Sequence, residues 1–447
     1  MFIAWLILPW ILTAHEIGQF ALLSFLIELL TRLTVLGTES AVLRFYVYQN
    51  KREQALAAAV FLLAAGGILS ALALTLTWNF VPALLVSLAP VYHELAVLVL
   101  LVAVVSAVAN TALTHHIASQ EAGQFGLLST MRSLLIATGY LLGAWMGYGL
   151  RALLISQLVA GLAVITYFCF TRPLRTRFVK PESSTVYELF AYGAPMLVYG
   201  LFALISDYSS RLILESRVTL VTIGIFQFYY QIVTQINGVW SSFNRAWTPY
   251  VFKQLDSEPA VAYSRITLFS FSGTICCAAG MIAAMLLGLT GFWSVTLPPL
   301  YNAHIDLFYL MLLGPLFCSV YTAIYPALYF DKNTVKISII QTIMSLMTIA
   351  ITLFLTIRYK SEGAALSWVL GSFITPLLYM SCFPSIRPRL MDSLMILLCW
   401  GIAGGVMVLA LLELHSILIA IAALLLGAAG AANYGRRALP LKLSFVR

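Results

Sequence analysis

Two residues of opposite charge lie four positions apart inside an apolar segment of this sequence. Asp207 and Arg211 occur in LISDYSSRLIL, directly after the apolar run APMLVYGLFA. This spacing places two side chains on one face of a helix, within reach of an ion pair. The arginine can bind two oxygens of a phosphate at once, and the acid can take up a proton if it is freed from the arginine.

A second segment has a similar arrangement. Glu28 and Arg32 are again four residues apart, and Glu39 follows near the same face. Arg44 lies further on, and Arg132 is a cation within another apolar segment. With Arg211 and Arg245, these residues supply more arginine than acid, which favours an anionic ligand such as a phosphate.

A polar stripe follows a third segment, TIGIFQFYYQIVTQINGVWSSFNRAW. Gln227, Gln231 and Gln235 recur every four residues, and Arg245 continues roughly along their face. A helix that faced lipid all round would not keep such a stripe. The aromatic residues beside it can stack on sugar rings, although packing and the interfacial belt explain each of them singly.

The composition of the chain indicates that these segments lie in a membrane. The 447 residues are 61% hydrophobic and 9% charged, with a mean hydropathy of +0.95, whereas soluble globular proteins carry about 25% charged residues. Apolar segments of roughly 20 residues recur along the chain, which is the length of a transmembrane helix. We expect an all-α, polytopic membrane protein without a cleavable signal peptide, because the first apolar stretch lacks a basic start and a cleavage site.

About fourteen transmembrane helices are expected. They cover 1–13, 17–48, 55–78, 92–115, 125–147, 150–171, 190–214, 221–247, 266–290, 305–330, 335–357, 363–383, 393–411 and 415–433. The second and eighth spans are weakly similar, with Gly18 aligned to Gly224. This parallel repeat predicts two six-helix lobes, residues 1–180 and 181–387, and then helices 13 and 14 with a cytoplasmic tail in 388–447, an architecture typical of transporters.

The loop cations give the orientation. One side of the expected topology holds just Arg151, Arg217, Arg358 and Lys360, whereas the other holds most of the remaining loop lysines and arginines. The cation-rich side is cytoplasmic by the positive-inside rule, so both termini are expected in the cytoplasm. This asymmetry explains the net charge of +8 without a nucleic-acid partner, and the basic loops favour anionic membrane lipids.

Charged residues inside the spans are functional candidates. At the centre of a bilayer such a residue costs about 2.5–3.5 kcal/mol on insertion scales. Structural alternatives stay open: the two acid–arginine pairs can be ion pairs alone, Arg132 can be an interhelical contact, and Arg44 can extend to the lipid headgroups.

No motif for enzyme chemistry is present. The sequence lacks a phosphate-binding glycine loop, its cysteines have no zinc-site spacing, and His115 and His116 point apart on a helix. The expected outward loops are too short for a polysaccharide polymerase. We expect a transporter, not an enzyme, with no cofactor and no metal.

The segment LTAHEIGQFALLSFLIELLTRLTVLGTESAVLRFY resembles the first helical hairpin of the polysaccharide and O-antigen flippases. These belong to the multidrug/oligosaccharidyl-lipid/polysaccharide exporter superfamily. The segment ELFAYGAPMLVYGLFALISDYSSRLIL is similar to the family's seventh helix, and IGIFQFYYQI to the start of its eighth. The matching positions are Glu16, Gly18, Leu36, Gly37, Arg44, Phe45, Glu188, Leu189, Tyr192, Gly193, Pro195, Asp207, Arg211, Phe226, Pro249 and Phe252.

This resemblance implies a two-lobed bundle with a central cavity, in which helices 13 and 14 offer a groove for a lipid tail. The implied substrate is an undecaprenyl-diphosphate-linked oligosaccharide, flipped from the inner to the outer leaflet of the bacterial inner membrane. Arg44, Arg211 and Arg245 are the first candidates for the diphosphate, followed by Arg32 and Arg132. Asp207, Glu28 and Glu39 are candidates for proton or cation coupling, and a polysaccharide polymerase with its chain-length machinery is a further possible partner.

Three other functions stay open at this point. A cation-coupled multidrug exporter of the same superfamily would favour an excess of acids, so the excess of arginine argues against it. The lipid II flippase of peptidoglycan synthesis has an arginine-rich cavity too, so charge does not separate it from a polysaccharide flippase. A polysaccharide polymerase is the least favoured of the three.

Overall fold

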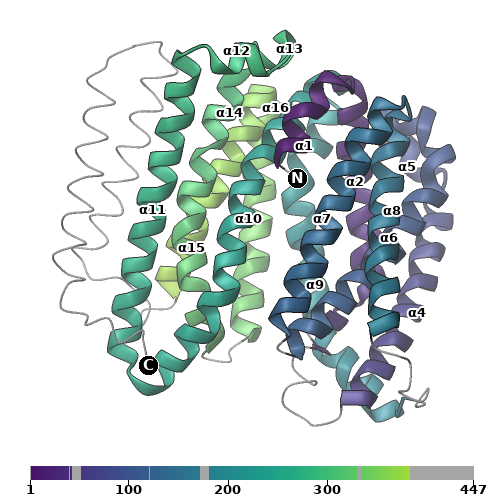
Figure 1. The fold of residues 1–447 in the computed structure, drawn as a ribbon, viewed down its shortest axis with the longest axis vertical. Coiled ribbons are helices and arrows are strands. Elements are labelled where there is room, and N and C mark those ends of the chain that lie inside the picture. Colours follow the sequence, from purple (N-terminus) through teal and green to yellow (C-terminus); the bar gives the residue numbers. More distant parts are fainter. Residues whose placement is uncertain are drawn as a thin grey trace. The chain divides into compact units, whose positions relative to one another are not determined.

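The computed structural model describes residues 2–39, 41–42, 52–119, 121–171, 181–330 and 334–382. In these ranges the chain is helical and contains no β-strand (Figure 1). The helices are α1 (Phe2–Ile7), η1 (Leu8–Trp10), α2 (Ala14–Val35), α4 (Arg52–Leu76), α5 (Phe80–Leu84), η2 (Val86–Leu88), α6 (Ala89–Ala118), α7 (Ala122–Trp145), α8 (Gly149–Thr171), α9 (Ser183–Glu215), α10 (Leu220–Ser257), α11 (Pro259–Leu289), α12 (Phe292–Thr296), α13 (Pro299–Asn302), α14 (Ile305–Met311), α15 (Leu313–Phe330) and α16 (Thr334–Cys382).

The prediction of an all-α, polytopic membrane protein is confirmed. Among the described residues, eight helical segments are long and apolar enough to cross a membrane. Predicted helices 13 and 14 lie outside the described residues. Two of the predicted spans, 335–357 and 363–383, fall within α16, and the backbone of Lys360, with φ 50° and ψ −124°, interrupts the helix between them.

The first predicted span, 1–13, is not one helix. The short α1 leads into the 3₁₀ turn η1, which contains Pro9. A capping box then starts α2: the Thr13 hydroxyl accepts a hydrogen bond from the Glu16 backbone N–H (3.2 Å), and Glu16 Oε2 accepts one from the Thr13 backbone N–H (2.9 Å). These bonds satisfy two N–H groups at the helix start, so α2 begins at Ala14, before the expected residue 17.

The α2 helix also ends well before the predicted residue 48. Its last residue is Val35, and the next two residues are left-handed, with φ 49° at Leu36 and 75° at Gly37. A left-handed residue stops a helix, and glycine adopts that conformation without strain. The prediction of one helix from 17 to 48 was therefore wrong.

Two glycine contacts bring α2 against later helices. A Cβ added at Gly18 would lie 2.2 Å from the Leu220 carbonyl oxygen, and one added at Gly224 would lie 1.8 Å from the Ala14 carbonyl oxygen. These distances leave no room for any side chain, so the backbones of α2 and α10 touch there. Gly37 makes a similar contact with α9, since its Cβ would lie 2.2 Å from the carbonyl oxygen of Gly193.

The chain divides into two compact units. Unit 1 is Met1–Phe228 with Gln341–Ala364, and unit 2 is Tyr229–Ile340 with Ala365–Arg447. The boundaries of these units differ from those of the predicted lobes, 1–180 and 181–387, and of the predicted C-terminal segment 388–447. The lobes and that segment stay predictions. In unit 2, α11 packs along α15.

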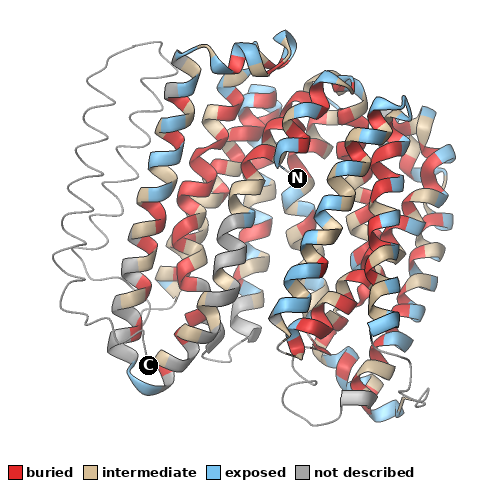
Figure 2. Cartoon of the chain, viewed as in Figure 1, coloured by how far each residue is buried: buried red, intermediate tan, exposed pale blue. Residues whose placement is uncertain are grey.

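In unit 1 the helix α2 lies at the centre. It packs against α4, α6 and α9, while α8 packs against α6 and α7. Of the spans in this unit, α2 and α6 bury the largest share of their residues, and α7 and α9 the smallest (Figure 2). The charged side chains of α2 therefore lie on a helix that is enclosed by its neighbours.

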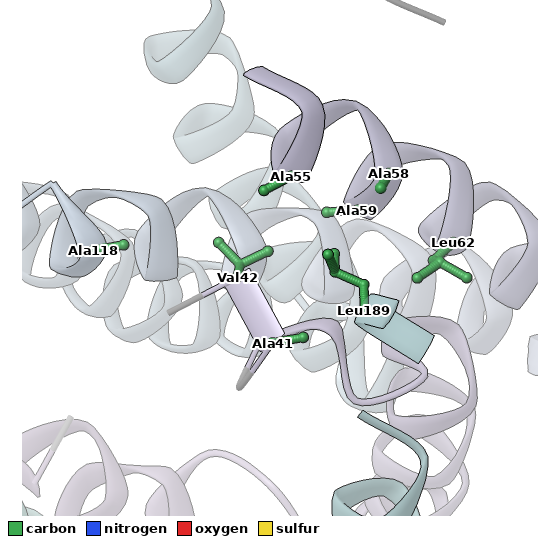
Figure 3. Close-up of a cluster of buried hydrophobic side chains, with 8 residues drawn as sticks. All are labelled: Ala41, Val42, Ala55, Ala58, Ala59, Leu62, Ala118 and Leu189. Atoms are coloured by element: carbon green, nitrogen blue, oxygen red, sulfur yellow. The ribbon is translucent and has the colours of Figure 1, made fainter. Parts of the chain in front are cut away.

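Small side chains pack one end of unit 1 together. The cluster joins the segment after α2, the start of α4, the end of α6 and the start of α9 (Figure 3). Its buried members are Ala41, Val42, Ala55, Ala58, Ala59, Leu62, Ala118 and Leu189. Small residues let membrane helices approach closely, which favours packing where the hydrophobic effect between helices is weak.

Candidate functional site

Arg211 is the most deeply buried of the predicted site arginines that the structure describes. Its residue surface is 1% exposed. Its Nε donates a hydrogen bond to Gln227 Oε1 on α10 (2.8 Å), and its Nη1 donates to the backbone carbonyl oxygen of Asp207. The rings of Tyr208 and Phe226 lie 5.0 Å and 5.7 Å from its Cζ. Two neutral acceptors and two aromatic rings thus contact this buried charge.

The ion pair predicted between Asp207 and Arg211 is not present. Within the described ranges no hydrogen bond or salt bridge joins the two side chains, although they are close enough to interact electrostatically. The Asp207 side chain is exposed, whereas Arg211 is buried. The physical reason is that the guanidinium already donates to Gln227 and to the Asp207 backbone.

The predicted pair of Glu28 and Arg32 is also absent as a salt bridge among the described residues. Arg32 is exposed, and its Cδ lies 4.0 Å from the point that a Cβ on Gly200 would occupy. The arginine therefore extends from α2 to the backbone of α9 instead of turning along its own helix. Asp207 on α9 is close enough to interact electrostatically with Arg32 and with Glu28.

Arg132 extends the charged site to α7. Its Nη1 donates a hydrogen bond to Asn110 Oδ1 on α6 (2.6 Å). It also interacts electrostatically with Glu28 and with Glu39, which follows the break after α2. The arginine is thus held by a neutral amide and remains near two acids.

The structure brings together six of the predicted site residues, which we name the charged group. Its members are Glu28, Arg32, Glu39, Arg132, Asp207 and Arg211, from α2, the turn after it, α7 and α9. Arginines and acids are equally numerous in it. The predicted excess of arginine depended on Arg44 and Arg245. Arg44 lies outside the described residues, and Arg245 lies on α10 with its side chain outside them.

The predicted glutamine stripe includes one buried residue and two half-buried ones. Gln227 is 1% exposed and belongs to unit 1, where its side chain accepts a hydrogen bond from Arg211. Gln231 and Gln235 are half-buried and belong to unit 2. A role of the three glutamines in substrate binding stays a prediction.

Two residues of the site were missed by sequence reasoning. Asn110 binds Arg132, and Tyr208 lies between Arg211 and the ring of Phe25 on α2, 5.6 Å from that ring. An asparagine inside an apolar span is itself a signal that could have been used. Nothing in the sequence around Tyr208 indicated that its ring would contact Arg211.

Two side-chain contacts between an acid and a basic residue are found in the described part of the chain, an Arg–Glu salt bridge and a His–Glu hydrogen bond, and neither includes a member of the charged group. Arg151 Nη2 lies 2.7 Å from Glu94 Oε2 at the start of α8, and His116 Nδ1 lies 2.9 Å from Glu121 Oε2 between α6 and α7. No group of three or more His, Cys, Asp or Glu side chains in the described ranges could hold a metal ion.

The fold is similar to that of solved transporters. The lipid II flippase MurJ, in its inward closed conformation, aligns with a TM-score of 0.73 and 12% identity over 98% of this chain and 97% of the MurJ chain. An inward-facing multidrug resistance transporter of the MATE family, from the MOP superfamily, aligns with a TM-score of 0.60 and 15% identity over 89% of this chain and 95% of its own. The Vibrio cholerae MATE transporter VcmN, in its bent form, aligns with a TM-score of 0.54 and 13% identity over 88% of this chain and 96% of the VcmN chain. The chain therefore has the MurJ and MATE type of transporter fold.

The sequence places the chain in one family within that class. The family described as "Polysaccharide biosynthesis protein" matches residues 1–255, which is more than half of the chain. The protein belongs to this family, and the resemblance drawn from the helical hairpins is confirmed. No curated protein matches the sequence.

Proposed function

We propose that the protein is a flippase for an undecaprenyl-diphosphate-linked oligosaccharide. It moves a polysaccharide repeat unit from the cytoplasmic to the outer leaflet by alternating access. The observation that carries this proposal is that Arg32 and Arg132 lie on membrane-spanning helices and neither forms a salt bridge within the described ranges. An arginine without a bound carboxylate is available to an anionic headgroup.

The arginines differ in how they reach a diphosphate. Arg32 is exposed and Arg132 is half-buried, so these two make the first contacts. Arg211 is buried. It contacts the diphosphate after Arg32 and Arg132, when α9 and α10 move during transport. Arg44 and Arg245 complete the set, as the sequence suggests, and Gln231 and Gln235 on α10 contact the sugar.

Coupling to a proton or cation is assigned to the acids of the charged group. Asp207 is exposed and lies near Arg32, so protonation of this acid changes the attraction that holds Arg32 against α9. Substituting Asp207, Glu28 and Glu39 by their amides is expected to abolish the pH dependence of transport. Unchanged transport and pH dependence in this triple variant would remove coupling from these acids.

The protein acts in the bacterial inner membrane, with both termini in the cytoplasm, and has no enzymatic activity of its own. Its partners are the lipid-linked oligosaccharide, the membrane lipids, and a polysaccharide polymerase with its chain-length machinery. Support comes from the family and from the fold shared with transporters.

Lipid II is the second candidate substrate, because the similar structure MurJ is a lipid II flippase. A cation-coupled multidrug exporter is the third, because MATE transporters share the fold and the acids of the charged group are as numerous as its arginines. A polysaccharide polymerase fits the fold least.

The deciding experiment uses cells that lack this gene, with the gene restored on a plasmid as the control. Polyprenyl-diphosphate-linked glycans are extracted and assigned to a leaflet. Finished repeat units on the cytoplasmic side, together with lost surface polysaccharide, are the expected result. Accumulated lipid II supports the second candidate. Normal lipid-linked pools with raised drug sensitivity contradict the proposal and support the exporter.

A further inference from the structure

Arg32 on α2 and Asp207 on α9 carry opposite charges, and both side chains are exposed. They are close enough to interact electrostatically. Within the described ranges, however, no salt bridge includes either of them. The two charges therefore attract each other without direct contact, and both are accessible to a ligand.

The position of Arg32 along α9 is given by a glycine. The Cδ of Arg32 lies 4.0 Å from the point that a Cβ on Gly200 would occupy. Gly200 precedes Asp207 by seven residues, which places both on one face of α9, about 10 Å apart along the helix axis. Arg32 thus contacts α9 about two turns before Asp207, a separation that a small ligand with two charges can span.

The charged group has no surplus of positive charge for a purely anionic ligand, since its acids and arginines are equally numerous. Arg132 is already near Glu28 and Glu39. An anion that draws Arg32 away from Asp207 leaves this acid near Glu28 with less compensation. Such a loss is costly in a site with little solvent, so an anion alone binds against an opposing force.

We infer that Arg32 and Asp207 together bind a zwitterionic headgroup, in which a phosphate contacts the arginine and an ammonium group contacts the acid. An amino sugar with a free amino group beside its linked phosphate has this chemistry, and so has the ethanolamine phosphate headgroup of a membrane lipid. The inference deepens the proposed function and rests on it, because it requires that Arg32 bind the phosphate of the substrate.

A zwitterion removes the opposing force because each of its charges replaces one partner of the pair. The ammonium compensates Asp207, and Arg32 is then available to the phosphate. Complementary charges of this kind contribute more to specificity than to affinity. The acid beside the arginine thus selects among phosphate ligands by requiring a positive charge close to the phosphate.

The test measures binding to the full chain in nanodiscs of phosphatidylglycerol at about pH 7. Glucosamine 1-phosphate is compared with N-acetylglucosamine 1-phosphate, in which the acetyl group removes the positive charge. Wild type is expected to bind the free amine about fivefold more tightly. The same comparison with O-phosphoethanolamine and its N-acetyl form separates the two sources: the pair with the larger preference identifies a sugar or a lipid headgroup.

Variants of Asp207 show whether its charge causes the preference. Asp207→Asn should bind both sugar phosphates equally and should bind geranyl diphosphate, which has no amine, more tightly than wild type. Asp207→Glu should keep the preference. Glu94→Gln removes the same charge from an acid outside the charged group and should behave as wild type. Destabilisation weakens binding of every probe, so it cannot produce this pattern.

The outcomes separate the two levels of the argument. If wild type binds neither geranyl diphosphate nor any other phosphate probe, the proposed function fails and this inference fails with it. If wild type binds geranyl diphosphate but does not distinguish amine from acetyl, only the zwitterion is overturned. A preference that persists in Asp207→Asn also overturns it. Melting temperatures show which variants are folded, and Asp207→Ser is used if Asp207→Asn is not.

Discussion

Arg32 and Arg151 carry the same side chain in different surroundings. Both are exposed. Arg151 lies at the start of α8 and pairs with Glu94 at 2.7 Å, an exposed pair worth only about 0–1 kcal/mol. Arg32 lies within α2 against α9, near the acid of Asp207, and forms no salt bridge in the described part of the chain. We therefore propose a functional role for Arg32 and not for Arg151.

We expect Arg32→Gln to lower transport by about tenfold or more, because a charge-assisted bond to the headgroup is lost. Arg151→Gln should transport at the wild-type rate and serves as the matched control. Transport is measured as appearance of the lipid-linked glycan in the outer leaflet. Equal rates for Arg32→Gln and wild type would contradict a role in headgroup binding.

Arg211 gives a second prediction at this scale. Arg211→Ala should lose transport and also destabilise the protein, because Gln227 loses its donor in a buried site. Arg211→Lys should keep part of the activity, since it retains the charge but not the fork. Transport and melting temperature are measured together. An Arg211→Ala variant with wild-type transport would remove Arg211 from the site.

The sequence predicted which residue types form the charged group but not their partners. Spacing of four residues indicated bonds within α2 and within α9. The structure instead joins Arg211 to Gln227 and Arg132 to Asn110 on other helices. Such partners depend on how helices pack, and periodicity along one helix carries no information about that.

At the scale of elements, the contact of α2 with α10 depends on two glycines. A Cβ at Gly18 or at Gly224 would lie within 2.2 Å of a backbone oxygen, which cannot move without moving its helix. Gly123 and Gly126 on α7 have no atom within 4 Å of an added Cβ. The four positions therefore form a matched set.

The same substitution should act in opposite directions in this set. Gly18→Ala and Gly224→Ala are expected to lower the melting temperature and transport, because α2 and α10 must separate. Gly123→Ala and Gly126→Ala are expected to raise stability by about 0.5–1 kcal/mol each, because alanine favours a helix more than glycine does. Thermal unfolding in detergent measures both effects. Equal shifts at all four positions would show that the helices are not in contact.

The ends of α2 illustrate what sequence reasoning can find at this scale. The sequence predicted a long second helix, and Thr13 and Glu16 carry the capping signature that starts it. Its end was missed, because the left-handed Leu36 is neither glycine nor asparagine, the residues that usually adopt this conformation at a helix end. Gly37 alone is a weak stop signal.

For the molecule as a whole, composition was enough to predict the class. Low charge and recurring apolar segments indicated a helical membrane protein, and a repeat indicated a transporter. The hairpin motifs indicated the family. Substrate identity was beyond reach, because a diphosphate headgroup presents the same chemistry whatever sugar it carries.

The membrane topology gives a prediction at this scale. Tyr148 and Tyr187 are 57% and 72% exposed and lie on opposite sides of the predicted topology. In a variant without native cysteines, Tyr148→Cys should react with an impermeant maleimide in right-side-out vesicles, and Tyr187→Cys only in inside-out vesicles. The reverse pattern would invert the topology and the proposed direction of transport.

The contact of Gly18 with Gly224 also has a consequence for mutation. The predicted repeat aligns these two residues, and an added Cβ on either would meet the backbone of the other's helix. Two separate codons supply the two sides of this contact, so each glycine must be maintained by its own selection. A single mutation at either position is then sufficient to separate the helices.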